Sequence, residues 1–287
     1  ASDGYVGPKL ERLEYQGLEV VDDAPEAGKM RFSSDNGRTW VDCKPVDNTS
    51  PEAQGVGGGP VVFDPNAGVL VGIGMRQLCV GDKFHNFTYY RYSRDYGITW
   101  TKPKQLRYEP GGDFDPKNPL KPGFLLRNQA YRGQNILLCR NGTIVHCVGA
   151  ANAPNDPDND NRAWRMGGVC FIGKWDPQTK DYQWKAGQRV SISPEISSRG
   201  LMEPEAAELT DGRLLVVWRG SDSSKAAGRK WYSVSTDGGR ILSEPAEWKY
   251  DDGSRFFSPS SWHRMLRHSV TGRLYWFGNI CAEPPDG

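Results

Sequence analysis

The chain has 287 residues, with 36 Lys and Arg against 35 Asp and Glu, so its formal net charge is +1. This balance argues against a nucleic-acid-binding or membrane-surface protein, because both normally need a clustered excess of basic residues. The 34 Gly and 20 Pro indicate a chain rich in turns, while 10 Trp, 12 Tyr and 10 Phe supply aromatic surface for a core. The composition therefore predicts a soluble, all-β globular protein.

Short β segments follow one another in chain order, and each pair is joined by a turn that contains glycine. The expected pairs are 60–63 with 69–73, 136–139 with 143–148, 206–209 with 214–218, and 265–268 with 274–278, and residues 87–92 form a further strand. No stretch shows the period of an amphipathic helix, so α/β folds are disfavoured. The longest apolar run, 214–218, is far shorter than the roughly 20 residues of a membrane span. We therefore expect no segment to cross a membrane.

A short motif recurs between these strands. Residues 33–40 (SSDNGRTW) and 93–100 (SRDYGITW) share Ser, Asp, Gly, Thr and Trp, and 235–240 (STDGGR) keeps the Ser, Asp and Gly. In each copy we expect a hairpin turn in which Asp caps backbone N–H groups, Gly supplies a positive φ and Trp packs beneath the loop. The long gap between the second and third copies leaves room for a unit whose turn is 175–184 (WDPQTKDYQW). Units of four strands and roughly 50 to 60 residues are typical of β-propeller blades.

The six cysteines are spread along the chain, and none has the C-x2-C spacing of a zinc site or a redox motif. Counting outward from the turn at Asn141 and Gly142 pairs Cys139 with residue 144, so no bridge between Cys139 and Cys147 is expected. Residues 155–161 (NDPDNDN) begin like a calcium loop but lack the Gly and Glu of an EF-hand, which favours a solvated loop. The sequence therefore predicts neither a metal nor a cofactor.

The two complete motifs, together with the hairpin 205–215, resemble the Asp-box (BNR-repeat) propellers of the sialidase superfamily, over about residues 30–278. The resemblance implies a sialidase-like β-propeller with six blades. At the spacing of the two complete motifs, the 287 residues hold about four to five blades. We therefore expect residues 1–287 to form a single Asp-box propeller domain that lacks its last blade or blades.

The resemblance also implies a set of chemical groups. Sialidases of this family bind the substrate carboxylate with three arginines, use an aspartate as general acid and base, and use a tyrosine nucleophile activated by a glutamate. Glu203, which opens 203–209 (EPEAAEL), matches the activating glutamate, and Arg219, which ends 214–219 (LLVVWR), matches the second arginine. The alternative is a Glu–Arg pair that only stabilises the ends of a hairpin.

Two further residues match the family at the end of the strand that begins near residue 69. Arg76 matches an arginine that ends an inner strand, and Asp82 follows six residues later, where the family has its general acid. An apolar pocket would raise the pKa of Asp82 and suit it to donate a proton to the leaving oxygen. The alternative for Asp82 is an ordinary turn residue after Gly81.

The chain departs from the family at two places. The family's first arginine precedes a proline in an R-I-P motif, but here Gly57, Gly58 and Gly59 precede Pro60. The third arginine and the tyrosine nucleophile are expected after 274–278 and are not in this chain, and Tyr275, inside that strand, is not assigned the role. Among the tryptophans, Trp218, Trp262 and Trp276 are expected to pack between blades rather than to stack on sugars.

The leading hypothesis is an exo-acting, retaining glycoside hydrolase that releases terminal sialic acid from glycans, with Asp82 and Glu203 as catalytic residues and Arg76 and Arg219 as substrate-binding residues. Two alternatives remain: a hydrolase for another terminal sugar, or a propeller that binds a glycan or a protein without catalysis. The expected partner is a sialylated or other glycan and not a nucleic acid, the expected location is secreted or periplasmic, and the oligomeric state stays open.

Overall fold

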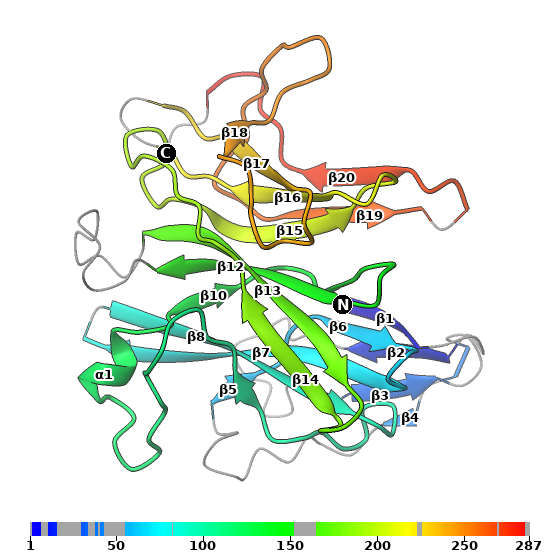
Figure 1. Ribbon diagram of the computed structural model, residues 1–287. Helices are drawn as coiled ribbons and strands as arrows, with labels where there is room; N and C mark the ends of the chain where they lie inside the picture. The colour runs from blue at the N-terminus through cyan, green and yellow to red at the C-terminus, as the bar shows by residue number, and fades with distance from the viewer. Residues whose placement is uncertain are drawn as a thin grey trace.

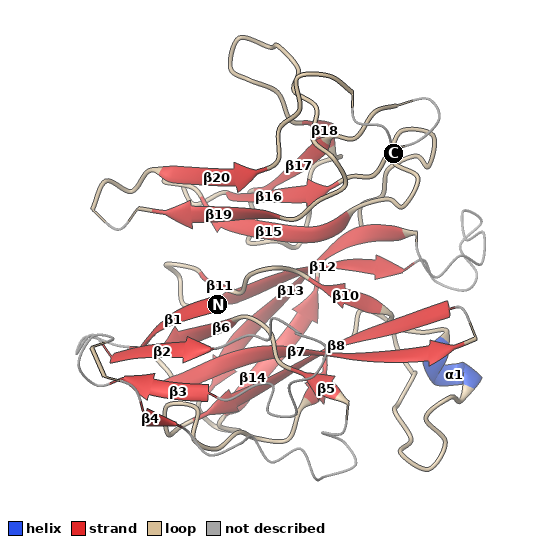
Figure 2. Cartoon of the chain, turned by 180° about the vertical axis from the view of Figure 1, so that it is seen from behind, coloured by secondary structure: helices blue, strands red, loops and turns tan. Residues whose placement is uncertain are grey.

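The computed structural model describes residues 2–6, 11–15, 30–33, 38–39, 41–42, 55–81, 83–151, 165–222, 226–268 and 270–284. Its regular structure is almost entirely β, and the helix α1 (Pro122–Leu125) is a single short turn. The strands form antiparallel sheets in which sequence neighbours are spatial neighbours. This arrangement confirms the all-β propeller fold, with each sheet as one blade (Figures 1 and 2).

The first two sheets come from the N-terminal part of the chain. The first has the order β1-β2-β3-β4, and the second has the order β5-β7-β8-β9 with β6 also paired to β7. Their bounds are β1 (Ser2–Val6), β2 (Glu11–Tyr15), β3 (Met30–Ser33), β4 (Val41–Asp42), β5 (Val56–Gly57), β6 (Val61–Asp64), β7 (Val69–Val80), β8 (Lys83–Ser93) and β9 (Lys104–Gln105).

The remaining sheets complete the chain. The third has the order β10-β12-β13-β14 with β11 also paired to β12, the fourth is β15-β16-β17-β18, and the fifth is the pair β19-β20. Their bounds are β10 (Ala130–Arg132), β11 (Leu137–Leu138), β12 (Ile144–Ala151), β13 (Met166–Asp176), β14 (Asp181–Ala186), β15 (Met202–Glu208), β16 (Leu214–Arg219), β17 (Lys230–Ser235), β18 (Ala246–Glu247), β19 (His263–Arg267) and β20 (Leu274–Gly278). The four expected hairpins and the turn within 175–184 are therefore confirmed.

The motif at 93–100 folds as a turn closed by its own side chains. The Gly97 N–H donates to Ser93 Oγ (2.8 Å), the Thr99 N–H donates to Asp95 Oδ1 (2.8 Å), and Trp100 Nε1 donates to the Gly97 carbonyl (3.0 Å). Gly97 has φ +90°, a conformation that disfavours any residue with a Cβ. The expected hairpin turn, capped by Asp and opened by Gly, is therefore confirmed here.

The third copy keeps the same turn without Thr or Trp. The Gly239 N–H donates to Ser235 Oγ (2.8 Å) and the Ile241 N–H donates to Asp237 Oδ1 (3.0 Å). The bonds need only the Ser and Asp side chains and backbone donors, so the positions after the glycine are free to change. Most of the first copy, at 33–40, lies outside the described residues, as does the loop 155–161.

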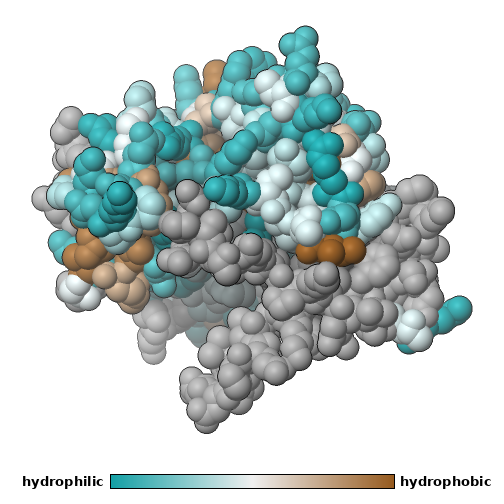
Figure 3. All heavy atoms as spheres, turned by 90° about the horizontal axis from the view of Figure 1, so that it is seen from below, coloured by the Kyte–Doolittle hydropathy of each residue, from teal (hydrophilic) through white to brown (hydrophobic). Residues whose placement is uncertain are grey.

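The core lies between the blades. One cluster joins the second and third sheets and includes Val71, Ile73, Val148 and Val169, all at most 2% exposed. Another joins the third and fourth sheets around Trp218, which is fully buried. Because each strand places alternate side chains on opposite faces, each inner blade buries both of its faces against its neighbours. Among the coloured residues in Figure 3, hydrophilic ones predominate and hydrophobic ones form small patches.

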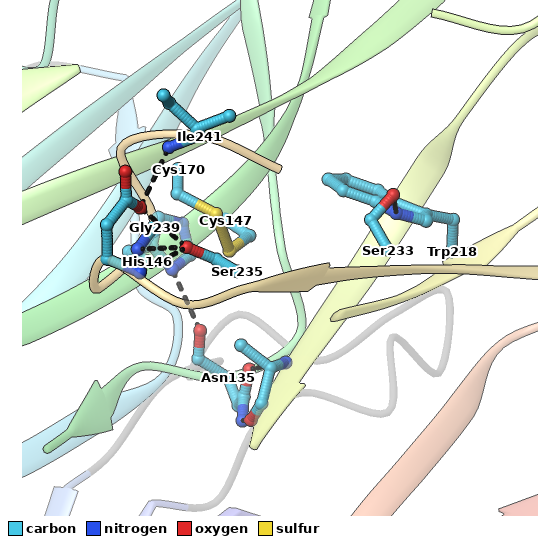
Figure 4. Close-up of a disulfide and its surroundings, with 11 residues drawn as sticks. Asn135, His146, Cys147, Cys170, Trp218, Ser233, Ser235, Gly239 and Ile241 are labelled. Carbon is cyan, nitrogen blue, oxygen red and sulfur yellow. Dashed lines mark hydrogen bonds between the residues drawn. A yellow bond between two sulfur atoms is a disulfide. The ribbon is translucent and has the colours of Figure 1, made fainter. Parts of the chain in front are cut away.

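A disulfide joins Cys147 on β12 to Cys170 on β13, at directly paired positions of the ladder. Cys139 is a buried free thiol and is not bridged to Cys147, as expected. The predicted register is wrong by one, because the connecting loop has one more residue and Leu138, not Cys139, pairs with Ile144. The turn at 235–241 of the fourth sheet lies beside this disulfide (Figure 4), where a Cβ on Gly239 would lie 3.2 Å from the Cys170 Cβ. Across the part of the chain that the structure describes, we find no helix of the length and apolarity that a membrane crossing requires.

Candidate functional site

Strand ends of the third, fourth and fifth sheets bring polar side chains together at one edge. In the register of the fourth sheet, Met202 pairs with Arg219, and Arg219 pairs with Lys230. The start of β15, the end of β16 and the start of β17 therefore lie side by side. The fifth sheet adds the segment that precedes His263, the first residue of β19.

Glu203 owes its position to an irregularity in β15. The register of β15 against β16 shifts between Met202 and Glu205, and Pro204, which has no N–H to donate, lies within the shift. Glu203 itself has φ +41°, a left-handed conformation that costs a non-glycine residue about 1 kcal/mol or more. The Pro204 carbonyl accepts a hydrogen bond from the Gln134 N–H of the third sheet (2.9 Å), which holds the irregular backbone in place.

The structure brings Glu203 and Arg219 together as an ion pair between Oε2 and Nη1. The other carboxylate oxygen, Oε1, accepts a hydrogen bond from Trp262 Nε1 (2.8 Å), and Arg219 Nε donates to Ser260 Oγ (3.0 Å). The side chains of Glu203 and Arg219 are 6% and 16% exposed, so the pair is largely withdrawn from solvent. The two residues therefore form an ion pair, and the segment before the fifth sheet also contacts it through Ser260 and Trp262.

Trp262 departs from the expected packing role. Its side chain is 62% exposed while Nε1 is bonded to Glu203, so the prediction that it packs between blades is wrong. Trp218 is fully buried, as expected, and Trp276 packs against Trp248 and Phe256. An exposed indole ring beside a carboxylate presents an apolar face on which a sugar ring can stack.

Lys230 is a site residue that sequence reasoning missed. It is fully buried, and Nζ donates to the carbonyls of Pro259 (3.2 Å) and Ser261 (2.8 Å) in the segment that leads to Trp262. The pKa of Lys230 is lowered to about 8, first by burial and then by the charge of Arg219, while Glu203 opposes the shift. The only signal in the sequence was a lysine directly before two aromatic residues, Trp231 and Tyr232.

Three further residues, Tyr131, Arg132 and Arg199, take part in electrostatic interactions around the ion pair. Burial raises the pKa of Tyr131, Glu203 raises it further, and the arginines at 132, 219 and 199 oppose the shift. Burial and the charge of Arg219 lower the pKa of Arg199. We call this group the Glu203 cluster, and its members are Tyr131, Arg132, Arg199, Glu203, Arg219, Lys230 and Trp262. It offers one carboxylate, one phenol, several cations and an exposed aromatic ring, which together can bind an anion, accept a proton and stack against a flat apolar group.

Arg76 lies in different surroundings. Its side chain is 1% exposed, Nη1 donates to Tyr89 Oη (3.1 Å), and the guanidinium carbon lies 3.4 Å from the centre of the Phe114 ring. Burial raises the pKa of Tyr89 to about 12, against the charge of Arg76. A pocket of about 270 Å³, lined by Arg76, Phe114 and Pro116 among others, opens beside it. These neighbours belong to the second sheet and the loop after it, whereas the Glu203 cluster is built by later sheets.

Asp82 lies outside the described residues, so its predicted role as a general acid stays a prediction, as does substrate binding by Arg76. In the described ranges, His, Cys, Asp and Glu side chains do not gather in threes or more as a metal ion would need.

No family model and no curated protein matches the chain. Solved structures with the same fold include a Dyadobacter fermentans protein of unknown function (16% identity, TM-score 0.57, 96% of this chain and 73% of the other). They also include the NanB sialidase of Streptococcus pneumoniae, at 12% identity and a TM-score of 0.51, which covers 95% of this chain and 59% of the sialidase. An α-L-arabinofuranosidase of Fusarium graminearum matches at 13% identity and a TM-score of 0.53, over 94% of this chain and 70% of the other. The chain thus spans about three fifths of the sialidase's length. Glycoside hydrolases are among the proteins that share this propeller fold.

Proposed function

We propose that the protein is a glycoside hydrolase that releases a terminal acidic sugar, sialic acid before others, from glycans. The observation that carries the proposal is the Glu203–Arg219 ion pair, which is largely withdrawn from solvent. The second carboxylate oxygen of Glu203 accepts a hydrogen bond from Trp262. A guanidinium can bind the substrate carboxylate, a neighbouring carboxylate can take a proton from a hydroxyl nucleophile, and an exposed indole can stack on the sugar. The propeller fold shared with glycoside hydrolases supports this reading.

The roles follow from the chemistry of an acidic sugar. The acid group next to the anomeric carbon repels a carboxylate nucleophile, so a phenol assisted by a base suits the reaction better. Glu203 is the proposed base, and Arg219 and Arg76 are the proposed ligands of the substrate. Asp82 is the proposed acid that protonates the leaving oxygen, and the hydrolysis retains the anomeric configuration.

The proposed location is secreted or periplasmic. The disulfide between Cys147 and Cys170 supports it, because such bonds form and persist in oxidising compartments and are rare in the cytosol of most organisms.

The test is an aryl sialoside assay with the full-length protein and two matched variants. Glu203→Gln should lower kcat by about 100-fold or more, the usual range for a lost catalytic base. Glu208→Gln, the same change at the other end of β15, where the side chain contacts Arg140, should keep kcat within about twofold. A folded wild type that releases no sialic acid sinks the sialidase proposal, and equal losses in both variants remove Glu203 from the mechanism.

A second candidate is a hydrolase for another terminal sugar. Gly58 stands where the family's first carboxylate-binding arginine is expected, which favours a substrate other than a sialoside. Turnover of an aryl arabinoside or uronide, with none of a sialoside, would select this candidate. Glycan binding without turnover of any of these substrates would instead select the non-catalytic propeller.

A further inference from the structure

Lys230 holds a tight turn at residues 259–261. The Pro259 carbonyl accepts hydrogen bonds from the Ser261 N–H (2.7 Å) and from the Ser261 hydroxyl (3.3 Å), so the chain changes direction within three residues. Lys230 Nζ donates to that same carbonyl (3.2 Å) and to the Ser261 carbonyl (2.8 Å). One buried ammonium group therefore bonds to both ends of the turn.

The turn supplies a partner to each member of the ion pair. Its central residue, Ser260, accepts a hydrogen bond from Arg219 Nε (3.0 Å). Trp262, directly after the turn, donates to Glu203 Oε1 (2.8 Å), although the residue is 62% exposed. The position of the turn therefore decides where the Trp262 ring lies and which group Arg219 Nε contacts.

The segment that contains the turn is anchored at both ends by contacts that do not involve Lys230. At one end the Ser258 N–H donates to the Gly228 carbonyl (3.1 Å), and a Cβ on Gly228 would lie 2.5 Å from the Ser258 carbonyl oxygen. At the other end His263 is 2% exposed, and its Nε2 donates to the Val217 carbonyl (3.2 Å). Loss of the Lys230 side chain should therefore loosen the turn between the two anchors and leave the segment attached.

A lysine at this position is costly for the strand itself. Lys230 is fully buried and lies opposite Arg219 in the ladder of β16 and β17. Its pKa is lowered first by burial and then by the charge of Arg219, and Glu203 offsets only part of this. An apolar residue of similar length would avoid both the lost hydration and the repulsion. The lysine therefore serves the turn rather than the strand.

We propose that Lys230 is a positioning residue, which holds the turn so that Trp262 stays bonded to Glu203 and Ser260 orients the Arg219 guanidinium. Lys230 touches no substrate itself and acts through the residues of the turn. Its effect on turnover rests on the proposed function, whereas its effect on Trp262 rests on the contacts alone.

Nuclear magnetic resonance of the indole N–H groups tests the positioning without any substrate. Trp262→Phe identifies the Trp262 Nε1–H signal in the isotopically labelled full chain. In wild type this proton should exchange slowly with water for so exposed a ring, because the Glu203 carboxylate accepts its bond. Lys230→Met keeps the length of the side chain and removes its donors. It should move the signal and speed the exchange by about fivefold or more, because the turn opens more often.

Two further variants separate positioning from general stability. Lys249→Met, the same change at an exposed lysine just after β18, should leave the Trp262 signal and its exchange as in wild type. Lys230→Gln keeps an N–H donor on a shorter side chain, so the exchange should lie between that of wild type and that of Lys230→Met. If Lys230→Met does not fold, Lys230→Gln carries the test.

Turnover gives a second measurement. With a glycoside that wild type hydrolyses, Lys230→Met should lower kcat/KM by about 10- to 100-fold, the loss expected when reacting groups are misplaced by about 1 Å. The same substitution made in Trp262→Phe should lower kcat/KM by a smaller factor, because the contact that Lys230 positions is already gone. A lysine that only stabilised the fold would lower kcat/KM by the same factor in both backgrounds.

The proposal is overturned if folded Lys230→Met, or Lys230→Gln in its place, shows the Trp262 signal and exchange of wild type. An equal loss of kcat/KM in both backgrounds overturns it as well. If the Trp262 signal depends on Lys230 but wild type hydrolyses no glycoside, only the proposed function is refuted.

Discussion

Individual residues in this molecule hold a backbone conformation or a buried position that costs free energy. Glu203 has a positive φ, and the hydrogen bond from the Gln134 N–H to the Pro204 carbonyl holds that conformation. Lys230 is buried with two backbone carbonyls as acceptors. Such unfavourable conformations and buried charges persist only where many surrounding contacts hold the residue in place, and they concentrate at functional sites. Both residues belong to the Glu203 cluster.

His146 should make the protein sensitive to acid. It is fully buried, and its Nδ1 donates to the Asn135 carbonyl (2.8 Å). Burial lowers its pKa to about 4, and the charge of Arg132 also lowers it. The unfolded chain then binds the proton first as pH falls, so the contribution of His146 to stability is present above about pH 6.5 and is lost toward pH 4. The loss amounts to about 3 kcal/mol.

Urea unfolding of wild type and His146→Gln between pH 7 and 4 measures this loss. The variant should be less stable at pH 7 and should lose less stability on acidification than wild type does. Burial also lowers the pKa of His263, to about 3, so both proteins should still lose some stability in acid. His268→Gln, a change at an exposed residue, is the control and should follow wild type. Equal acid dependence in wild type and His146→Gln would contradict the prediction.

At the scale of elements, the turns that share Ser, Asp and Gly, together with the disulfide, secure the connections within and between blades. The turns at 93–100 and 235–241 use the same Ser and Asp bonds, although only the first has Thr and Trp. The disulfide fixes β12 to β13, and the turn that contains Gly239 packs against it. These turns therefore contribute to the folding of the blades, while the Glu203 cluster forms where other strands end.

Asp95→Ala should lower the free energy of unfolding by about 1 to 2 kcal/mol, because Asp95 accepts hydrogen bonds from both the N–H and the hydroxyl of Thr99. Asp113→Ala is the matched control: its carboxylate is 77% exposed and pairs with Arg107, and such surface pairs contribute little. Urea unfolding compares the two variants, and kcat should be unchanged in both. Equal losses of stability in the two variants would show that the bonds between Asp95 and Thr99 contribute no more than an exposed ion pair does.

At the scale of the whole molecule, buried carboxylates join successive blades. Glu205 is 1% exposed, and Oε1 accepts a hydrogen bond from Arg264 Nη1 (2.8 Å) while Oε2 accepts one from the Met265 N–H. Burial raises the pKa of Glu205, and the bonds from Arg264 and Met265 oppose the rise. Arg264 also donates to the Gln134 carbonyl (2.6 Å), so the third, fourth and fifth sheets meet at this point. In Figure 1, β19 lies beside β15, and β20 is paired to β19.

Glu205→Gln should loosen the fifth sheet from the fourth. The substitution removes the charge that pairs with Arg264 and one of the two acceptor oxygens, so we expect a loss of about 2 to 3 kcal/mol. Hydrogen exchange should become faster across His263–Arg267 before it changes in Leu214–Arg219. Glu244→Gln, at an exposed residue, should leave both rates as in wild type. If hydrogen exchange became faster uniformly over the whole chain, the prediction that Glu205 connects these two sheets locally would be contradicted.

Contacts within one hairpin or one turn were accessible from the sequence alone. The pairing of Glu203 with Arg219 follows from the hairpin that contains both. The turns at 93–100 and 235–241 follow from side chains that bond to backbone groups a few residues away. The spacing of these turns also indicated the propeller. Register and turn chemistry are local properties, so the residues that determine them are neighbours in the sequence.

Contacts between blades were decided only by the tertiary structure. The bond from Trp262 to Glu203 and the bonds from the buried Lys230 join residues that are far apart in the sequence. The pairing of Cys147 with Cys170 depends on the register of β12 and β13, whose connection carries no short turn signal. Such contacts follow from how whole sheet faces pack, and no local pattern of residue types encodes that packing.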